Sequence, residues 1–110
     1  MIINTKEVNG TGIRFSLILK GKEVGRAYLY LLKNDLHQQP FGFIEDVFVN
    51  ESERGQGIGS KLVQEIVKQA KEKGCYKLIC TSRTKKTEVH ALYQNIGFQD
   101  WGKEFRIDFQ

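Results

Sequence analysis

A glycine-rich turn between a strand pattern and a helix pattern is the feature that most constrains the fold of this chain. Before the turn, residues 43–49 form a continuous run of apolar, β-branched and aromatic side chains, which is typical of a central strand. After it, apolar residues recur at spacings of three and four, which predicts an amphipathic helix that ends near Gly74. The apolar positions of that helix are Ile58, Leu62, Val63, Ile66, Val67 and Ala70. A helix that starts after such a turn presents unpaired backbone N–H groups, so this point of the chain suits a phosphate group.

The spacing of the glycines does not fit two common phosphate-binding motifs. A Walker P-loop requires Lys and then Ser or Thr after its last glycine, but here Ser60 precedes Lys61. A dinucleotide fingerprint requires two residues between its second and third glycine, but only one residue separates Gly57 from Gly59. The turn reads Arg-x-x-Gly-x-Gly, and a flexible turn without a ligand is the simpler alternative. Its residues are Arg54, Gly55, Gln56, Gly57, Ile58 and Gly59.

A second motif lies in the C-terminal part of the chain. Residues 87–98 predict a helix that Thr87 caps, that ends at Gly97, and that is followed by the apolar Phe98. Together the two motifs resemble the signatures of the GNAT superfamily of N-acetyltransferases. These signatures are an Arg-x-x-Gly-x-Gly pyrophosphate loop for acetyl-coenzyme A (acetyl-CoA) and a helix ending in Tyr-x-x-x-Gly-Phe. The resemblance covers residues 41–109, well over half of the chain.

The order of the predicted elements indicates an α+β fold in a single domain that spans residues 1–110. The expected strands cover residues 13–19, 24–31, 41–49, 76–81 and 104–109, and the expected helices lie between them at residues 58–73 and 87–96. A type II′ turn at Gly21-Lys22 is expected to join the first two strands. The resemblance implies the GNAT fold, a sheet of mixed strand direction with helices over its faces. Members of that family usually insert two helices between their first two strands. Because only residues 1–12 precede the first clear strand here, we expect a reduced N-terminal region and acceptor pocket.

The resemblance implies two candidate catalytic residues, an acid and a base. An amine acceptor is an ammonium ion at neutral pH, with a pKa near ~10, so it must lose a proton before it attacks a thioester. Glu45 is the expected base, and its neighbour Asp46 should point to the opposite face of the sheet. The alternative is that Glu45 merely pairs with a cation on the sheet face. Tyr93 is the expected acid, because the family's tyrosine at this position protonates the departing thiolate, and a role as a core aromatic is its alternative.

The resemblance also implies how acetyl-CoA is held. Backbone groups of a strand segment would bond the pantetheine arm, and amides of the turn would cradle the pyrophosphate, with Arg54 adding positive charge. The strand residues are Val47, Phe48 and Val49, and the turn residues are Arg54, Gly55, Gln56, Gly57, Ile58, Gly59 and Ser60. Gly57 and Gly59 would allow close approach of the phosphates.

Charge and composition favour no other class of ligand. The net charge is +4, but the lysines are dispersed and no basic stripe with interleaved aromatics is present, so a nucleic-acid surface is not expected. No apolar run approaches the ~20 residues of a membrane span, and the N-terminus lacks a signal-peptide pattern. Cys75 and Cys80 should lie roughly 16 Å apart on one strand, too far to form a disulfide, which favours the cytoplasm. The two histidines, His37 and His90, have no metal-ligand spacing, and His90 is more simply structural.

The predicted function is transfer of an acetyl group from acetyl-CoA to a primary amine of a small molecule or a peptide. Parts of the central strand and turn resemble glucosamine-6-phosphate N-acetyltransferases in particular. A non-catalytic acyl-CoA-binding or partner module is the alternative, and a small basic nucleic-acid-binding domain ranks last. The segment from Trp101 to Phe109 predicts a one-sided apolar strand at a sheet edge, which is typical of a homodimer contact. Trp101 and Phe105 are the alternative candidates for lining an acceptor pocket.

Overall fold

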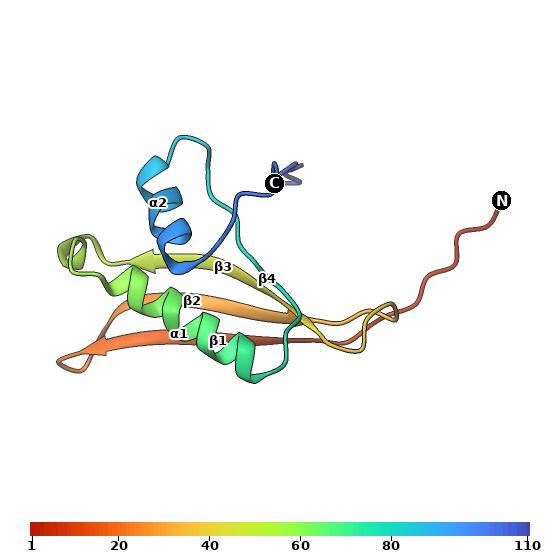
Figure 1. Cartoon of the computed structure of the whole chain (residues 1–110), viewed down its shortest axis with the longest axis horizontal. Helices are drawn as coiled ribbons and strands as arrows, with labels where there is room; N and C mark the ends of the chain where they lie inside the picture. The colour runs from red at the N-terminus through yellow and green to blue at the C-terminus, as the bar shows by residue number, and fades with distance from the viewer. The chain divides into compact units, whose positions relative to one another are not determined.

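The computed structural model describes all of residues 1–110, and their contacts divide the chain into two compact units, residues 1–80 and 81–110. The first unit contains, in chain order, β1 (Gly10–Leu19), β2 (Lys22–Leu32), β3 (Phe41–Val49), the 3-10 turn η1 (Glu51–Glu53), α1 (Ile58–Glu72) and β4 (Leu78–Ile79) (Figure 1). The second unit contains α2 (Thr87–Ile96).

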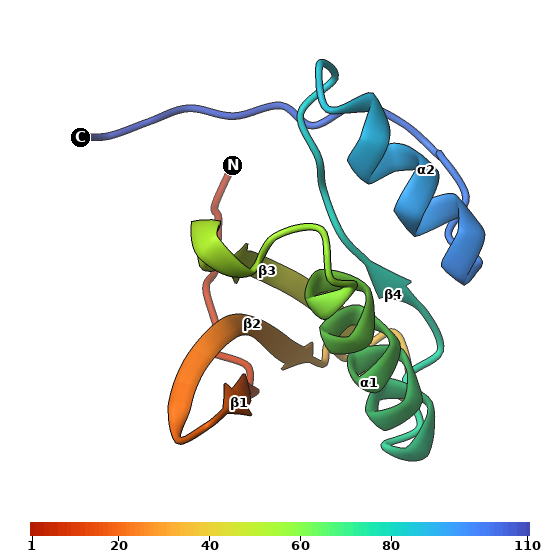
Figure 2. The ribbon, with the colours of Figure 1, turned by 90° about the vertical axis from the view of Figure 1, so that its left-hand side faces the viewer.

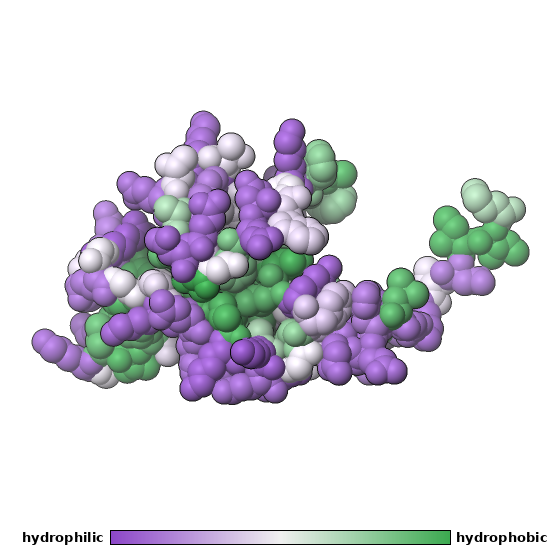
Figure 3. All heavy atoms as spheres, viewed as in Figure 1, coloured by the Kyte–Doolittle hydropathy of each residue, from purple (hydrophilic) through white to green (hydrophobic).

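A single four-stranded sheet with strand order β1-β2-β3-β4 forms the first unit's centre. The first three strands are antiparallel neighbours, whereas β4 runs parallel to β3. A parallel pair needs a crossover connection, and α1 provides it. The predicted α+β fold with a sheet of mixed strand direction is therefore confirmed. Residues 1–9, which precede β1, form neither helix nor strand. Figure 3 shows apolar atoms at the outer end of this segment, where Ile2 and Ile3 are exposed.

The helix α1 lies over one face of the sheet, and the other face is covered by no helix of this unit (Figure 2). The predicted apolar stripe of α1 forms much of the core. Its buried residues are Ile58, Leu62, Val63, Ile66 and Ala70, and the buried apolar residues of the sheet are Phe15, Val24, Ala27, Leu29 and Ile44. Gly25 of β2 allows the close approach of α1, because a Cβ atom at this position would lie 2.8 Å from Cγ2 of Ile58. The start of α1 is thereby fixed against the sheet.

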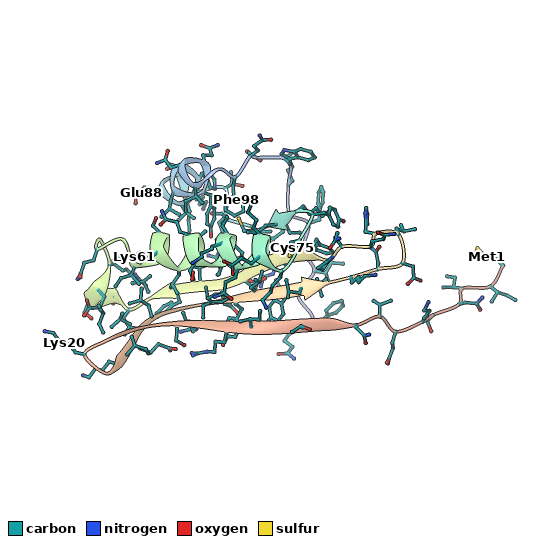
Figure 4. The ribbon with its side chains drawn as sticks, turned by 60° about the horizontal axis from the view of Figure 1, so that its bottom comes forward. Met1, Lys20, Lys61, Cys75, Glu88 and Phe98 are labelled. Atoms are coloured by element: carbon teal, nitrogen blue, oxygen red, sulfur yellow. The ribbon has the colours of Figure 1, made fainter.

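The β1–β2 hairpin differs from the predicted type II′ turn. Leu19 pairs with Lys22, so the two loop residues are Lys20 and Gly21 and not Gly21 and Lys22. Both loop residues have positive φ, 50° and 78°, as a type I′ turn requires. The predicted turn was wrong because the pairing of Leu19 with Lys22 places the loop one residue earlier in the chain. Figure 4 labels Lys20 at the tip of this hairpin.

The fourth strand is much shorter than predicted. Residues 76–81 were expected to form it, but only Leu78 and Ile79 pair, with Gly42 and Phe43 of β3. Cys75 lies after the end of α1 (Figure 4) and Cys80 after β4, so the two cysteines do not share a strand. Both are free thiols, as the prediction that they do not bridge requires. Beyond Phe43, the outer edge of β3 has no neighbouring strand.

The second unit is built around α2. Lys86 and not Thr87 is its N-terminal cap, and no side chain hydrogen-bonds there, so the predicted Thr87 cap was wrong. The helix ends as predicted at Gly97, where the amide of Phe98 donates to the Tyr93 carbonyl at 3.0 Å. The predicted strand at residues 104–109 is absent. Alternating apolar side chains do not make a strand without a partner to accept its hydrogen bonds, and Phe105 and Phe109 are more than 90% exposed.

Candidate active site

A β-bulge interrupts β3 directly after the candidate base. On β2, Ala27 alone separates Arg26 from Tyr28, whereas Asp46 and Val47 together occupy the corresponding place on β3. Asp46 has a φ of 53°, a left-handed conformation that Asp adopts more readily than most residues. One extra residue on one strand of an antiparallel pair is the definition of a bulge, and it bends the strand and increases its twist.

The bulge determines which side chains share a face of the sheet. Glu45 pairs with Tyr28 and Phe48 with Arg26, and these two partners are alternate residues of β2. Glu45 and Phe48 therefore face the same side, although an uninterrupted strand would turn them to opposite sides. The preceding Ile44 is buried in the core, so this shared side is the one opposite α1. We call it the open face, and Glu45 is exposed on it.

The outer edge of β3 presents free main-chain groups next to this face. The amide of Asn50 donates to the carbonyl of Val24 at 2.8 Å, so at Asn50 the main chain is directed toward β2. Because direction alternates along a strand, the N–H and C=O groups of Val49 and Val47 point to the outer edge. The Val49 carbonyl accepts a hydrogen bond from Nε of Arg54 at 3.1 Å. An extended ligand could pair with the remaining groups as an added strand does.

The turn that follows β3 leads into α1, a helix whose N-terminus has no side-chain cap. Gly55 and Gly57 have φ of 86° and 78°, and a Cβ at either position would meet nothing within 4 Å. These glycines are thus required by backbone conformation, and the space beside them is free. Gly57 is the N-cap of α1, no side chain hydrogen-bonds there, and the first turn contains no acidic residue. The first amides of α1 therefore lack a partner from the protein, which fits a phosphate ligand. Ser60 accepts a hydrogen bond from Gln64 at 3.3 Å.

A polar cluster occupies the part of the open face near the hairpin. Both guanidinium N–H₂ groups of Arg14 contact the carboxylate of Glu23, and Nε of Arg14 donates to the Tyr28 hydroxyl at 3.1 Å. The hydroxyl of Ser16 donates to the same carboxylate at 2.6 Å. The hydrogen bonds from Arg14 and then Ser16 lower the pKa of Glu23 to about 2. Arg14 is therefore engaged by the protein itself.

A second arginine site on the open face was missed at the sequence level. The guanidinium carbon of Arg26 lies 4.6 Å from the centre of the Phe48 ring, and that of Arg54 lies 5.7 Å from the same ring. Both distances are within the range of cation–π contacts. The only sequence signal for Arg26 was its place in a strand whose alternate residues face outward. Without the pairing register, that signal does not connect Arg26 with Phe48.

The second unit contains the candidate acid. Tyr93 is half-buried on α2, and its ring centre lies 5.5 Å from that of Phe98. His90 contacts the carbonyl of Arg83 through Nε2 at 2.9 Å, a contact typical of a structural histidine. The hydroxyl of Ser82 is buried and has no hydrogen-bond partner. These contacts all lie within residues 81–110.

Two further features bear on the class of protein. No group of three or more His, Cys, Asp and Glu side chains is placed to hold a metal ion. Neither helix has the length and apolar character needed to cross a membrane. A bulged strand with an unpaired edge, followed by a glycine turn and an uncapped helix, is an arrangement of an α+β protein that suits an extended, phosphate-bearing ligand.

Comparison with known proteins identifies the family. Residues 6–98 match the model of the acetyltransferase (GNAT) family, and the chain belongs to this family. The chain is 35% identical over 89 residues to a glucosamine 6-phosphate N-acetyltransferase of Trypanosoma brucei brucei, covering 80% of this chain and 58% of the relative. It is 36% identical over 58 residues to a thialysine N-epsilon-acetyltransferase of Bos taurus, covering 53% and 34%. The chain thus spans about a third to somewhat over a half of the length of these curated relatives.

A solved structure agrees with this assignment. The structure of an acetyltransferase from Trypanosoma brucei superposes with a TM-score of 0.80 at 30% sequence identity. The superposition covers 89% of this chain and 69% of that one. The predicted GNAT fold is therefore confirmed.

Proposed function

We propose that the chain works as a single acetyltransferase domain, which transfers an acetyl group from acetyl-CoA to a primary amine. Family membership and a match that runs from residue 6 to residue 98, across both compact units, support this proposal. The observation that carries it is the continuous path from the unpaired edge of β3 through the glycine turn to the uncapped start of α1. A pantetheine arm needs such an edge, and a pyrophosphate needs such a helix start.

The cofactor would be held mainly by the backbone. The edge-directed groups of Val47 and Val49, with Phe48 between them, would bind the pantetheine arm. The pyrophosphate would lie against the turn and the first amides of α1. The residues that would surround it are Arg54, Gly55, Gln56, Gly57, Ile58, Gly59 and Ser60. Arg54 would add a positive charge there, and acetyl-CoA would supply an activated thioester carbonyl.

Glu45 would act as the base on the acceptor. It is exposed on the open face and lies directly before the bulge, in the part of β3 whose outer edge is unpaired. Its carboxylate has no hydrogen bond or ion pair, so it is available to take a proton from the ammonium group, directly or through water. The free amine would then attack the thioester carbonyl, which forms a C–N bond and breaks the C–S bond.

Tyr93 would return a proton to the departing sulfur. A phenol with a pKa near ~10 is matched to a strongly basic thiolate. The family motif, in which this tyrosine precedes Gly97 and Phe98 at the end of α2, supports this role. As the intermediate collapses, the nitrogen loses its second proton, which would restore the Tyr93 phenol after that phenol has protonated the sulfur. The one net proton of the reaction is then the one held by Glu45, which would pass to solvent after each turnover.

The acceptor is proposed to be a small amine or a peptide amine. The relatives named above act on glucosamine 6-phosphate and thialysine, both of which carry a primary amine. The open face is not covered by a helix of residues 1–80, so it would accept ligands of different shape. We also propose that the chain forms a homodimer, because the segment from Trp101 to Phe109 exposes large apolar side chains that a second copy would cover.

Two measurements test the function. Acetyl-CoA at a hundredfold excess over its dissociation constant should raise the unfolding free energy by about 2.7 kcal/mol, which thermal unfolding detects. Incubation with acetyl-CoA and a panel of amines should then release free thiol. Cofactor binding without thiol release from any amine would favour the non-catalytic acyl-CoA-binding module. The absence of a thermal shift at millimolar acetyl-CoA would contradict the proposal as a whole.

A further inference from the structure

Arg26 presents a positive charge on the same face of the sheet as Glu45. Its side chain lies against the ring of Phe48, the residue directly opposite it on β3. Because Tyr28 is the partner of Glu45, Arg26 and Glu45 are separated by two strand positions. At ~3.3–3.4 Å per residue, this separation is about 7 Å along the strand direction.

The charge of Arg26 is not neutralised by a salt bridge, unlike that of its neighbour on the same face. Arg14 has a full set of partners in Glu23, Ser16 and Tyr28. Arg26 makes no ion pair, and Arg54, the other guanidinium over Phe48, makes none either. The carboxylate of Glu23 interacts with Arg26 at longer range, but its oxygens are occupied by Arg14 and Ser16. Two cations thus flank one aromatic ring without a paired anion.

A guanidinium that lies over an aromatic ring can still bind an anion. The cation–π contact uses no N–H donor, so the N–H groups of the guanidinium remain able to donate hydrogen bonds. Both guanidinium carbons lie close to the centre of the same ring, so they are within about 10 Å of each other. Phosphate and carboxylate groups match this arrangement in charge and in hydrogen-bond geometry.

We propose that Arg26, held against Phe48, receives an anionic group of the acceptor and thereby selects amines that also carry a phosphate or carboxylate. This inference rests on the proposed function, because it takes Glu45 as the position of the amine. Arg26 is a specificity-determining residue in this scheme and takes no part in proton transfer. Tyr28 is directly opposite Glu45 and two residues from Arg26 on β2, so its ring would contact the acceptor from below.

A matched pair of acceptors and of variants tests the proposal. Glucosamine 6-phosphate and glucosamine differ only in the anionic group. Arg26→Gln should lower kcat/KM for glucosamine 6-phosphate about ten- to hundredfold through KM, as expected for the loss of charge-assisted hydrogen bonds. It should change kcat/KM for glucosamine less than twofold. Arg26→Lys, which keeps the charge but not the planar fork, should recover only part of the loss. Lys22→Gln, which removes one charge from the start of the same strand, should leave both amines unaffected.

A direct binding measurement decides the question even if neither sugar is a substrate. In the presence of saturating coenzyme A, which occupies the phosphate sites of the turn, inorganic phosphate should shift the arginine Nε–H NMR signal that Arg26→Gln removes. An unmoved signal, or an equal loss of kcat/KM for both sugars, would overturn the proposal. So would a loss of acetyl-CoA affinity in Arg26→Gln without discrimination between the sugars, since the anion would then be the cofactor's. Failure of the whole function is seen separately, as the absence of a thermal shift of the wild type with acetyl-CoA.

Discussion

Replacing Gly57 with alanine should separate the cost of backbone strain from the loss of cofactor binding. Gly57 has a φ of 78°, and an added Cβ would meet nothing within 4 Å. The substitution therefore creates no clash and acts only through the left-handed backbone, at a cost of roughly 1–2 kcal/mol. For a chain of this length, each 1 kcal/mol lost lowers the melting temperature by roughly 4–8 °C, so the expected drop is roughly 4–16 °C.

Gly21 offers a closely matched control for this experiment. It lies in the β1–β2 loop, also has a φ of 78°, and likewise has nothing within 4 Å of an added Cβ. Gly21→Ala should therefore lower the melting temperature of the protein alone by about as much as Gly57→Ala does. The hairpin loop is not part of the proposed cofactor site, so the response of Gly21→Ala to acetyl-CoA should equal that of the wild type.

The two variants should differ in their response to the cofactor. At a hundredfold excess over the wild-type dissociation constant, acetyl-CoA stabilises the wild type by about 2.7 kcal/mol. If the alanine at position 57 weakens binding tenfold, the same concentration stabilises that variant by only about 1.4 kcal/mol. Differential scanning fluorimetry with and without acetyl-CoA measures both quantities. Equal cofactor-induced shifts in Gly57→Ala and Gly21→Ala would refute the assignment of this turn to the pyrophosphate.

Further substitutions test the chemistry and the electrostatics. Tyr93→Phe preserves the ring and its packing, so thiol release should fall about 10²-fold in kcat with little change in acetyl-CoA affinity. Glu45→Gln should lower kcat by at least as much, whereas Asp46→Asn, which retains a residue that tolerates positive φ, should keep most of the activity. Because its partners lower the pKa of Glu23 to about 2 in the folded protein, the stabilisation from Glu23 is complete above pH ~4.5 and is lost as the pH falls toward 2. Glu23→Gln should flatten that part of the curve of melting temperature against pH. Light scattering at micromolar concentration should give twice the mass of one chain, and a monomer mass would contradict the homodimer.

The elements that a sequence pattern predicts well here are those whose own side chains determine them. The helix α1 has an apolar stripe that repeats every three or four residues, and the structure buries that stripe against the sheet. The strand β3 is apolar throughout its first half and is central in the sheet. In both elements, burial of the residue's own side chain is the dominant energetic term.

The features that the sequence did not predict depend on distant residues. The loop of the hairpin is set by the pairing of β1 with β2, so Lys20 adopts positive φ although Asn, Asp or Gly is usual at that position. The apolar alternation at residues 104–109 indicated a strand, but that segment pairs with no other strand. The facing of Glu45 and the contact between Arg26 and Phe48 both follow from where the extra residue of β3 is inserted. None of these can be obtained by reading one segment alone.

The extra residue in β3 also reverses the alternation of side chains between the two faces of the sheet. Up to Glu45 the odd-numbered residues face away from α1, whereas at Phe48 an even-numbered residue does so. A deletion of one residue between Glu45 and Phe48 would restore regular alternation along the strand. Either the Glu45 carboxylate or the Phe48 ring would then lie on the opposite face of the sheet. A substitution at one of these positions alters one side chain, whereas an insertion or deletion of one residue moves every side chain on one side of the change to the other face of the sheet. Variation in length at this point should therefore be tolerated far less than variation in residue type.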